Sequence, residues 1–434
     1  MKKSLNKKIL YGLYLFSLLF TYTDGFGLRG EGSWGGWGNE NFGPFGLLQL
    51  VVLIVSIVLA IQSGGFLFSR NSRTSSGVKW FLALFLIIIL QLLFQSAVVD
   101  VDKISKYSNL IKLKHWLILF SIPALYHYLG IKGTLNTIKL SGLISAIIVI
   151  VVVVGNVQGT AIKTMQSTDV THAFRVLMPT SSLIAFSFFL FLSSYKEGQR
   201  LTDFLSVVTC FVASFIQLHR SSVIALIVAT VLFIILEFKL SMKKILKYAV
   251  LGIVSIFALN LIFKSVDYSY TMLGDFFAES NERISEGSDN GASMRLGMIR
   301  NGLAFVIQNY YILGLGLDWM PIQNAVDYNF FQFAETPTND NGYYNIIIVF
   351  GFLGLLLFFR MLGGLLWSSF KNRKKMIVVD YRVASVGLFY YLVYTIMVSL
   401  GGDHFFFDPI FPLVIGMILL NDTIIRKVAR NQFG

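Results

Sequence analysis

The segment Glu335–Phe359 reads ETPTNDNGYYNIIIVFGFLGLLLFF. Four small polar residues, Thr338 to Asn341, stand directly before a long apolar run that contains Gly351 and Gly354. All four belong to residue types that favour helix N-caps, and an apolar run of this length can cross a bilayer. The segment therefore predicts a capped membrane helix. The polar cluster is either a helix cap alone or a cap and the edge of a reactive site together.

The apolar composition extends over the whole chain. Its 434 residues are 55% hydrophobic and 14% charged, with a mean hydropathy of +0.69, whereas soluble domains are about 25% charged. This composition predicts an all-α polytopic integral membrane protein. The single cysteine, Cys210, excludes an intrachain disulfide and a cysteine-rich metal site. The net charge of +13 does not indicate nucleic acid, because most basic residues stand in short loops between apolar segments.

About twelve transmembrane helices are predicted from the apolar runs. The first is an uncleaved helix, because no small-x-small cleavage site follows it. Two neighbouring spans are interrupted only by LHRSS, so they should form a tight hairpin. The predicted spans are 9–23, 45–68, 78–99, 114–131, 135–155, 173–194, 203–219, 221–238, 245–263, 342–366, 384–401 and 409–421.

The distribution of lysine and arginine places both termini in the cytoplasm, although the outside loop 100–114, with four lysines, fits badly. The chain then divides into nine transmembrane helices in 1–263, one long outside loop in 264–341, and three transmembrane helices with a tail in 342–434. In the long loop, Leu296, Ile299, Leu303, Val306 and Tyr310 follow helical spacing. They predict an amphipathic helix that lies on the membrane, covers a cavity or packs on the bundle.

The candidate site residues gather at the predicted outer face. Ionisable groups near membrane depth are costly, and guanidinium groups bind phosphate bidentately and stay charged. Arginines near one membrane surface therefore predict an anionic ligand. The outer-face residues are His172 and Arg175 at the start of a span; His219 and Arg220 at the hairpin; Arg283, Arg295 and Arg300 in the long loop; and Asp340, Asp403, His404 and Asp408 beside the last spans.

Each candidate also has a purely structural interpretation. Arg175 can reach lipid phosphate, whereas Arg220 stands in a turn that seldom needs arginine. Arg300 lies about 140° around a helix from Arg295, so the two should not share a ligand. His404 can be an interfacial histidine without a task.

Other charged residues fit structural tasks, and the outer face lacks metal motifs. Asp403 and Asp408 can cap helices. Glu237 and Arg360 fall at inner helix ends and are interpreted as topology markers. No HExxH, no DxD and no spaced His/Cys cluster is present on this face, so no metal site is predicted.

Three segments in this order resemble the bacterial O-antigen polymerase and ligase superfamily. LHRSSVIALIVATVLFIIL resembles its arginine-plus-apolar segment. ASMRLGMIRNGLAFVIQNYYILGLGLDWM resembles its loop pattern of an arginine, an amphipathic helix and a glycine turn. NDNGYYNIIIVFGFLGLLLFF resembles its segment that re-enters the membrane. The resemblance covers roughly 210–360, and elsewhere it concerns topology alone.

The resemblance implies a GT-C-like glycosyltransferase of the bacterial inner membrane that acts at the periplasmic face without metal or cofactor. Arg220 and Arg295 match the arginines expected to bind the donor diphosphate, and Gly314 and Gly316 match the loop glycines. Asn341 matches the Asn of the family's His-Asn pair. YIL stands where the family usually has a proline turn.

Asp340 occupies the position where ligases carry histidine, which favours a polymerase over a ligase. A carboxylate or imidazole near the acceptor hydroxyl can act as a base, so the predicted catalytic residues are Arg220, Arg295, Asp340 and His404. The predicted substrate-binding residues are His172, Arg175, Arg300, Asn341, Tyr344 and Asp403.

The expected function is a polymerase that moves a growing glycan from undecaprenyl diphosphate onto the next lipid-linked repeat unit. The expected partners are this lipid-linked oligosaccharide and membrane lipid. An O-antigen ligase that transfers to lipid A-core, and a transporter or lipid-glycan flippase, remain alternatives. The sequence leaves open the sugars, their linkage and whether a chain-length regulator binds.

Overall fold

The structure is a computed structural model of the whole chain, and its described residues concentrate in the central and C-terminal parts. They comprise 117–154, 181–216, 220–238, 341–375, 378–400 and 410–433; short pieces at 165–166, 174–175, 199–200, 299–300, 303–304, 307–308 and 312–314; and scattered residues between 8 and 90, with 405 and 408. The statements below concern these residues.

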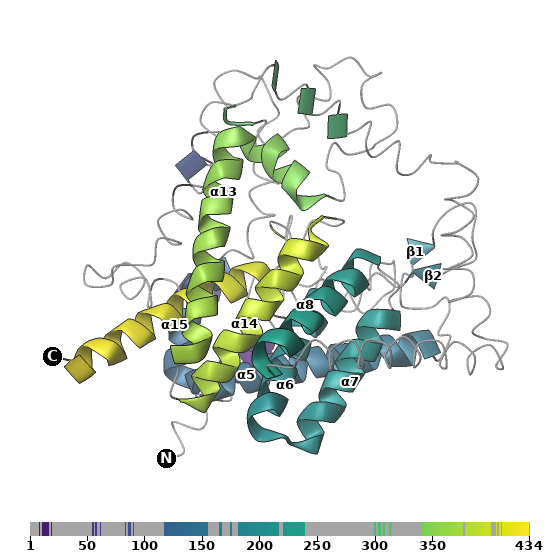
Figure 1. Cartoon of the computed structure of the whole chain (residues 1–434), viewed down its shortest axis with the longest axis vertical. Coiled ribbons are helices and arrows are strands. Elements are labelled where there is room, and N and C mark those ends of the chain that lie inside the picture. Colours follow the sequence, from purple (N-terminus) through teal and green to yellow (C-terminus); the bar gives the residue numbers. More distant parts are fainter. Residues whose placement is uncertain are drawn as a thin grey trace.

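The described part of the chain is a helical bundle (Figure 1). Its helices are α5 (Leu117–Val154), α6 (Ser181–Gly198), α7 (Leu201–Ile216), α8 (Arg220–Phe238), α13 (Gly342–Lys375), α14 (Val379–Val398) and α15 (Ile410–Phe433). The all-α prediction therefore holds for the described residues, apart from one two-residue strand pair.

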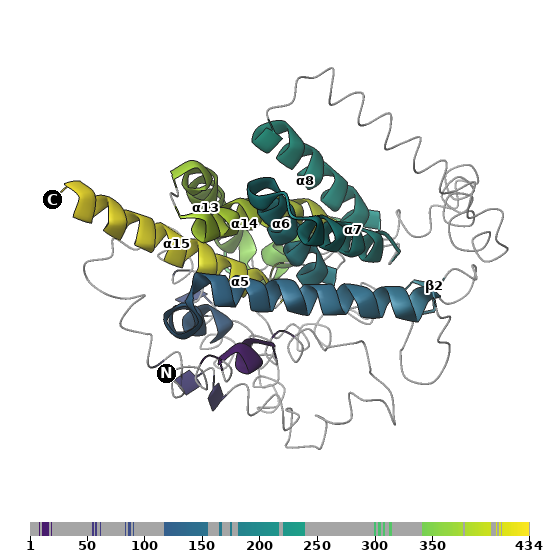
Figure 2. The ribbon, with the colours of Figure 1, turned by 90° about the horizontal axis from the view of Figure 1, so that it is seen from below.

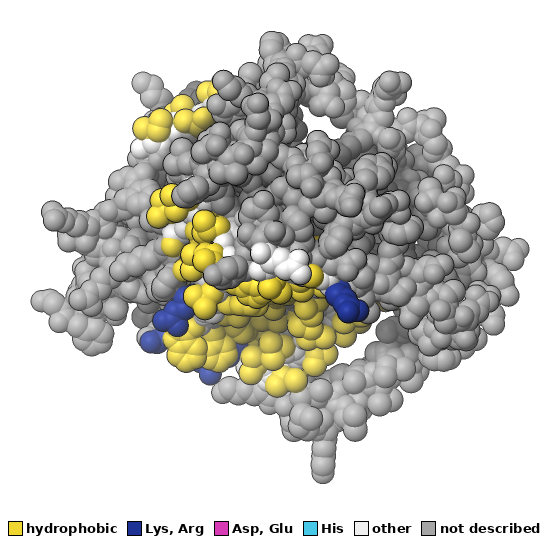
Figure 3. Space-filling model, turned by 90° about the horizontal axis from the view of Figure 1, so that it is seen from above, with side chains coloured by type: hydrophobic (Ala, Val, Ile, Leu, Met, Phe, Trp, Pro, Cys, Tyr) yellow, Lys and Arg dark blue, Asp and Glu magenta, His cyan; other side chains and the backbone are white. Residues whose placement is uncertain are grey.

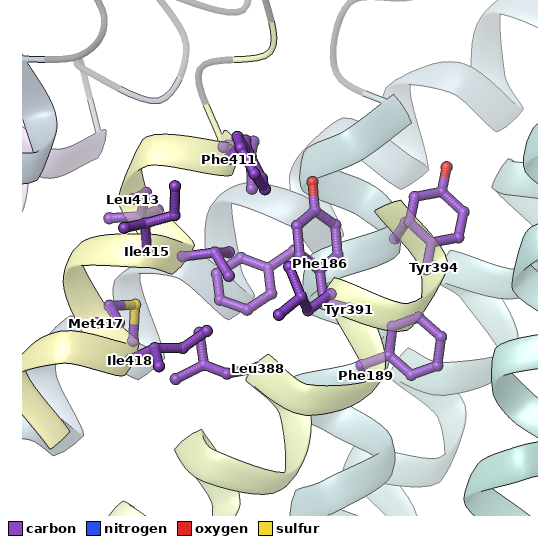
Figure 4. Packing of buried hydrophobic residues seen from close by; sticks show 14 of the residues in the cluster. Phe186, Phe189, Leu388, Tyr391, Tyr394, Phe411, Leu413, Ile415, Met417 and Ile418 are labelled. Carbon is purple, nitrogen blue, oxygen red and sulfur yellow. The ribbon is translucent and has the colours of Figure 1, made fainter. Parts of the chain in front are cut away.

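The core of the bundle forms around α6 and α14. α6 packs against α5, α7 and α14, and α14 also packs against α8 and α13. Aromatic rings fill the contact: Phe186 lies 4.9 Å from Tyr391, centroid to centroid, and Phe189 lies 6.4 Å from Tyr394. Apolar side chains of α15, among them Phe411, pack on the same cluster (Figure 4). Buried rings of this size supply much of a core's apolar contact.

Gly351 bends α13 back on itself. Its φ of 66° and ψ of −169° lie outside the helical region and are accessible mainly to glycine. The rings of Tyr343 and Phe359 stack with centroids 5.8 Å apart, whereas a straight helix would separate these positions by about 24 Å. The predicted span 342–366 thus lies within α13, but the helix is bent at Gly351 and is not one straight segment. A short arm, 342–350, leads to the bend, and a longer arm, 352–375, descends through the bundle (Figure 1).

The close antiparallel pair is α6 with α7, not α7 with α8. Gln199 adopts a positive φ of 48° and its backbone N–H donates to the Tyr195 carbonyl at 2.7 Å, which closes the turn between α6 and α7. α8 instead packs along α14 and has little contact with α7. The prediction that 203–219 and 221–238 pack together as a tight hairpin is therefore wrong. The connection between them, 217–219, lies outside the described residues.

The predicted start of a span at 173 is also wrong. Residues β1 (Met165–Gln166) and β2 (Phe174–Arg175) form a short antiparallel pair in which Met165 faces Arg175. α6 begins only at Ser181. In the sequence, Pro179 stands between β2 and α6, and the residue before a proline is disfavoured in helical conformation. Arg175 therefore does not open a membrane helix.

Four helices in the described part are long and apolar enough to cross a membrane: Ser121–Val151, Ser221–Phe238, Gly342–Lys374 and Val379–Val398. α7 and α15 carry shorter apolar stretches. The predicted count of twelve rests on other segments as well, including 245–263, which lies outside the described residues.

The end of the molecule nearest the α13 bend is seen in Figure 3. Most of its described surface is hydrophobic, with Lys and Arg side chains at the margin. A surface of this kind suits contact with lipid tails or with another apolar surface rather than with water. Membrane orientation and the GT-C architecture remain predictions.

α5 changes direction at Gly130, which has a φ of 70° and a ψ of 166°. The two predicted spans 114–131 and 135–155 thus meet at this residue without an intervening loop. Beyond the bend, α5 runs across the lower part of the bundle at a steep angle to the descending arm of α13 (Figures 1 and 2). It packs there on α6 and α7, and Ser187 of α6 donates to the Ile138 carbonyl at 3.0 Å.

A buried charge cluster joins four helices. Glu237, at the end of α8, pairs with Arg373 of α13 and with Lys196 of α6, the latter at 2.5 Å. The hydroxyl of Tyr390 from α14 donates to Glu237 at 2.9 Å. The Arg373 side chain is 2% exposed and stacks on the Phe370 ring at 4.3 Å. Arg373 is therefore buried among four helices, and Glu237 does more than mark topology.

Candidate functional site

The last turns of α14 hold the start of α13, and Asn341 makes the connection. Its Oδ1 accepts the backbone N–H groups of Tyr343 and Tyr344, both at 3.0 Å. Its Nδ2 donates to the Leu400 carbonyl at 3.2 Å, while Gly342 N–H donates to the Ser399 carbonyl at 2.8 Å. Asn341 is therefore the residue of the polar cluster that caps α13, as the cap prediction required of one member.

The bend in α13 receives a turn from the long loop. Gly314 and Gly351 both have positive φ, 72° and 66°. Their backbones lie so close that a Cβ on either would overlap the backbone of the other segment. The Leu353 N–H donates to the Ile312 carbonyl at 3.2 Å, so the loop satisfies a donor beside the bend. Gly314, which matches a family glycine, thus has a defined packing task.

The amphipathic loop helix, defined by helical residues between 299 and 308, packs on the short arm of α13. Ile299 and Leu303 contact the buried pair Tyr344 and Ile348. This contact supports the interpretation in which the helix packs on the bundle. Arg300 is exposed, as its position one residue from Ile299 requires. Tyr344 is 4% exposed, so in this conformation its ring lies beneath the loop helix.

The first turn of α8 lies against the same end of α14. α8 begins at Arg220, and two residues later the hydroxyl of Ser222 is hydrogen-bonded to the hydroxyl of Tyr394. Leu400, which binds Asn341, is six residues beyond Tyr394, or about 9 Å along a helix. The first turn of α8, with Arg220, and the capped start of α13 therefore contact neighbouring turns at the same end of α14. The start of α8 also carries the partial positive charge of a helix N-terminus, which favours anions.

Asp408 forms a buried carboxylate at this end of the bundle. It is 6% exposed, its Oδ1 accepts the Ile410 N–H at 2.8 Å and its Oδ2 accepts the Tyr391 hydroxyl at 3.4 Å. The predicted capping role of Asp408 is confirmed, because Ile410 starts α15. The bonds to Ile410 and Tyr391 tie α15 to α14 beside Tyr394.

The predicted site residues fall into three groups. Asn341, Tyr344 and Arg300 are placed with their side chains, as described above. For Arg220 and Arg175 the structure places the backbone, at the start of α8 and in β2, but not the side chain. The remaining predicted residues lie outside the described part of the chain: His172, Arg295, Asp340, Asp403 and His404.

The polar contact between Ser222 and Tyr394 at this end was not predicted. Neither Ser222 nor Tyr394 carries charge, and each stands inside an apolar run, so neither draws attention in the sequence. The one available signal is spacing: Tyr390 and Tyr394 stand four residues apart and share one face of α14. Among the described residues, no three His, Cys, Asp or Glu side chains come together as a metal-binding group.

The comparison with known families fits this geometry. The sequence model of the O-antigen ligase family matches residues 205–359, a segment that contains most of α7, all of α8 and the α13 bend. No curated protein matches the chain. The family contains glycosyltransferase-like polymerases and ligases that act on lipid-linked glycans in a membrane. The resemblance predicted for roughly 210–360 is therefore confirmed for this segment, which is similar to the O-antigen ligase family and consistent with the O-antigen polymerase and ligase superfamily.

Proposed function

We propose that the protein is a surface-glycan polymerase. It transfers a growing glycan from undecaprenyl diphosphate to the next lipid-linked repeat unit at the periplasmic face of the inner membrane. The observation that carries the proposal is the family match over 205–359 together with Arg220 at the first turn of α8. A helix N-terminus and a guanidinium group at one point suit a diphosphate.

The reaction requires stabilisation of a departing diphosphate. A hydroxyl of the acceptor sugar attacks the anomeric carbon of the donor, a new glycosidic C–O bond forms, and the C–O bond to undecaprenyl diphosphate breaks. Negative charge grows on the leaving oxygen, where Arg220 and Arg295 would stabilise it. The acceptor proton passes to a base, for which Asp340 and His404 are the candidates. Alignment of the two lipid-linked substrates supplies a further share of the rate.

A ligase is the second candidate function, because the matching family model is described as O-antigen ligase. Against it stands Asp340, which occupies the position of the ligase histidine. An ionised carboxylate accepts hydrogen bonds only, whereas histidine both donates and accepts. A carboxylate is thus compatible with deprotonation of an acceptor hydroxyl and cannot reproduce the full range of imidazole chemistry.

Two experiments test the proposal. In a strain that lacks the gene, electrophoresis of surface glycan should show lipid capped by single repeat units, and a normal ladder of long chains would contradict a polymerase. A ligase would instead leave polymer on undecaprenyl lipid and none on lipid A-core. Purified protein supplied only with lipid-linked repeat units should form longer lipid-linked chains. Movement of these lipids across a bilayer without new glycosidic bonds would identify a flippase.

A further inference from the structure

α8 is a peripheral helix that docks on the bundle through one narrow face. Its buried residues Ser222, Ala225, Ala229 and Phe233 follow helical spacing and face the bundle. The opposite face is exposed and apolar: Ile224, Ile227, Val228 and Val231. Small buried residues let α8 approach α14 closely. Small residues interlock less than large ones, so polar contacts help to set the position of α8 along α14.

Two tyrosines of α14 provide those contacts, one near each end of α8. Tyr394 is bonded to Ser222 near the start of α8, and Tyr390 donates to Glu237 near its end at 2.9 Å. The two tyrosines are one turn apart on α14, whereas Ser222 and Glu237 are about 22 Å apart along α8. Phe233 of α8 packs on the Tyr390 ring, with the ring centroids 4.8 Å apart. α8 is therefore held at two points by hydroxyl groups from one helix.

The Tyr394 end is supported by further buried polar groups. The Tyr391 ring lies 5.7 Å from that of Tyr394, and the Tyr391 hydroxyl donates to Asp408. Asp408 also lies close enough to Tyr394 to interact with it electrostatically. Ser182 at the start of α6 is hydrogen-bonded to Tyr391. Helices α6, α8 and α14 and the start of α15 thus meet in one buried polar cluster. Its member on α8, Ser222, stands two residues after Arg220.

We propose that Tyr394 and Ser222 are positioning residues that fix the first turn of α8 and thereby set the place of Arg220 at the donor diphosphate. The proposal rests on the proposed function for its catalytic consequence, but the placement of residue 220 can be measured without activity. Tyr390 makes the matching contact at the far end of α8. It serves as the internal control, because its hydroxyl is bonded about 22 Å from the Ser222 contact along α8.

The expected effect is moderate. Tyr394→Phe and Ser222→Ala each remove one neutral hydrogen bond and leave the apolar contacts in place. Such a bond contributes about 0.5–1.5 kcal/mol, which corresponds to roughly a 2- to 10-fold change in an equilibrium or a rate. If both residues act through Arg220, the double variant should lose no more than either single variant. The loss should also shrink in an Arg220→Lys background, where the bidentate contact is already gone.

The experiment uses the full-length protein in lipid nanodiscs with Cys210→Ala as background. A charged maleimide reports the accessibility of an introduced Arg220→Cys thiol, and the initial rate of chain extension on lipid-linked repeat units reports activity in the Arg220 protein. We expect Tyr394→Phe to change the labelling rate at position 220 about 2- to 10-fold and to lower turnover with a smaller change in donor KM. Tyr390→Phe removes bonds to the charged groups of Glu237 and Arg373, so it should lower the unfolding temperature at least as much, yet leave both readouts within about 2-fold.

Each outcome tests either the positioning role of Tyr394 and Ser222 or the proposed polymerase activity. Equal effects of Tyr390→Phe and Tyr394→Phe on labelling, or unchanged labelling in both, would overturn the positioning role. Additive losses of turnover in Ser222→Ala/Tyr394→Phe would do the same. If the parent protein forms no polymer from lipid-linked repeats, the polymerase proposal fails, and the labelling comparison alone decides whether Tyr394 positions residue 220.

Discussion

Replacement of Gly351 by alanine should open the bend in α13. The backbone there has a φ of 66° and a ψ of −169°, a conformation that costs a residue with a side chain about 1–3 kcal/mol. The new Cβ would overlap the Ile312 carbonyl and displace the bond from that carbonyl to the Leu353 N–H, which is worth about 0.5–1.5 kcal/mol. The bent form should therefore lose about 2–4 kcal/mol relative to a straight helix.

A cross-linking assay measures the bend directly. With Tyr343→Cys and Phe359→Cys in a Cys210→Ala background, a short bifunctional thiol reagent should join the two positions, because their native rings are in contact. A straight helix would hold them about 24 Å apart. Gly351→Ala should reduce the cross-linked fraction strongly and lower the unfolding temperature.

Gly363→Ala on the same helix is the matched control. Nothing lies within 4 Å of a Cβ at Gly363, and alanine is better than glycine in a helix by about 0.8–1 kcal/mol. This variant should keep the cross-link and unfold at the same or a higher temperature. Full cross-linking and unchanged stability in Gly351→Ala would refute the argument that glycine is required for the bend.

Three further predictions concern the described residues. Arg220→Ala should abolish polymer while the protein still inserts, with Lys371→Ala, an exposed basic residue of α13, as the control; glycan electrophoresis of complemented deletion strains measures both. Arg373→Met should destabilise the fold by about 3–5 kcal/mol because it leaves Glu237 buried beside one partially exposed lysine, whereas replacing both partners with apolar residues should cost less; thermal unfolding in detergent tests this. Asn341→Ala should cost about 1 kcal/mol through loss of the α13 cap, measured in the same way.

The general architecture was readable from composition, but the direction of α13 was not. Hydropathy counts apolar residues and contains no information about where the chain turns, so 342–366 satisfied the criterion for a single span. In the sequence, Gly351 is only one of several glycines inside this apolar run. Its positive φ accompanies contact with Gly314, thirty-seven positions earlier in the chain, and no local pattern reveals that partnership.

The partners of Glu237 and of Asn341 could not be predicted from the local sequence either. Glu237 was interpreted as a topology marker at the inner end of a span, and nothing in the local sequence marks Arg373 as its partner. They are separated by 136 positions in the sequence, and their pairing becomes visible only when α8 and α13 are placed together. The cap at Asn341 was predictable as one of four residues. The choice among the four depends on Ser399 and Leu400, which the local sequence does not contain.

These contacts narrow the role of the polar cluster before α13. The Asn341 side chain already serves the backbone of α13 through Oδ1 and that of α14 through Nδ2. Its main task is therefore to hold the start of α13 in place, and only one amide hydrogen remains for a ligand. The proposed base in this cluster is therefore Asp340, the residue before Asn341 in the sequence. Because both polar atoms of the Asn341 side chain are bonded to backbone groups, Asn341 itself is held in a fixed place, and a catalytic group needs fixed support of this kind to meet its substrate in one geometry.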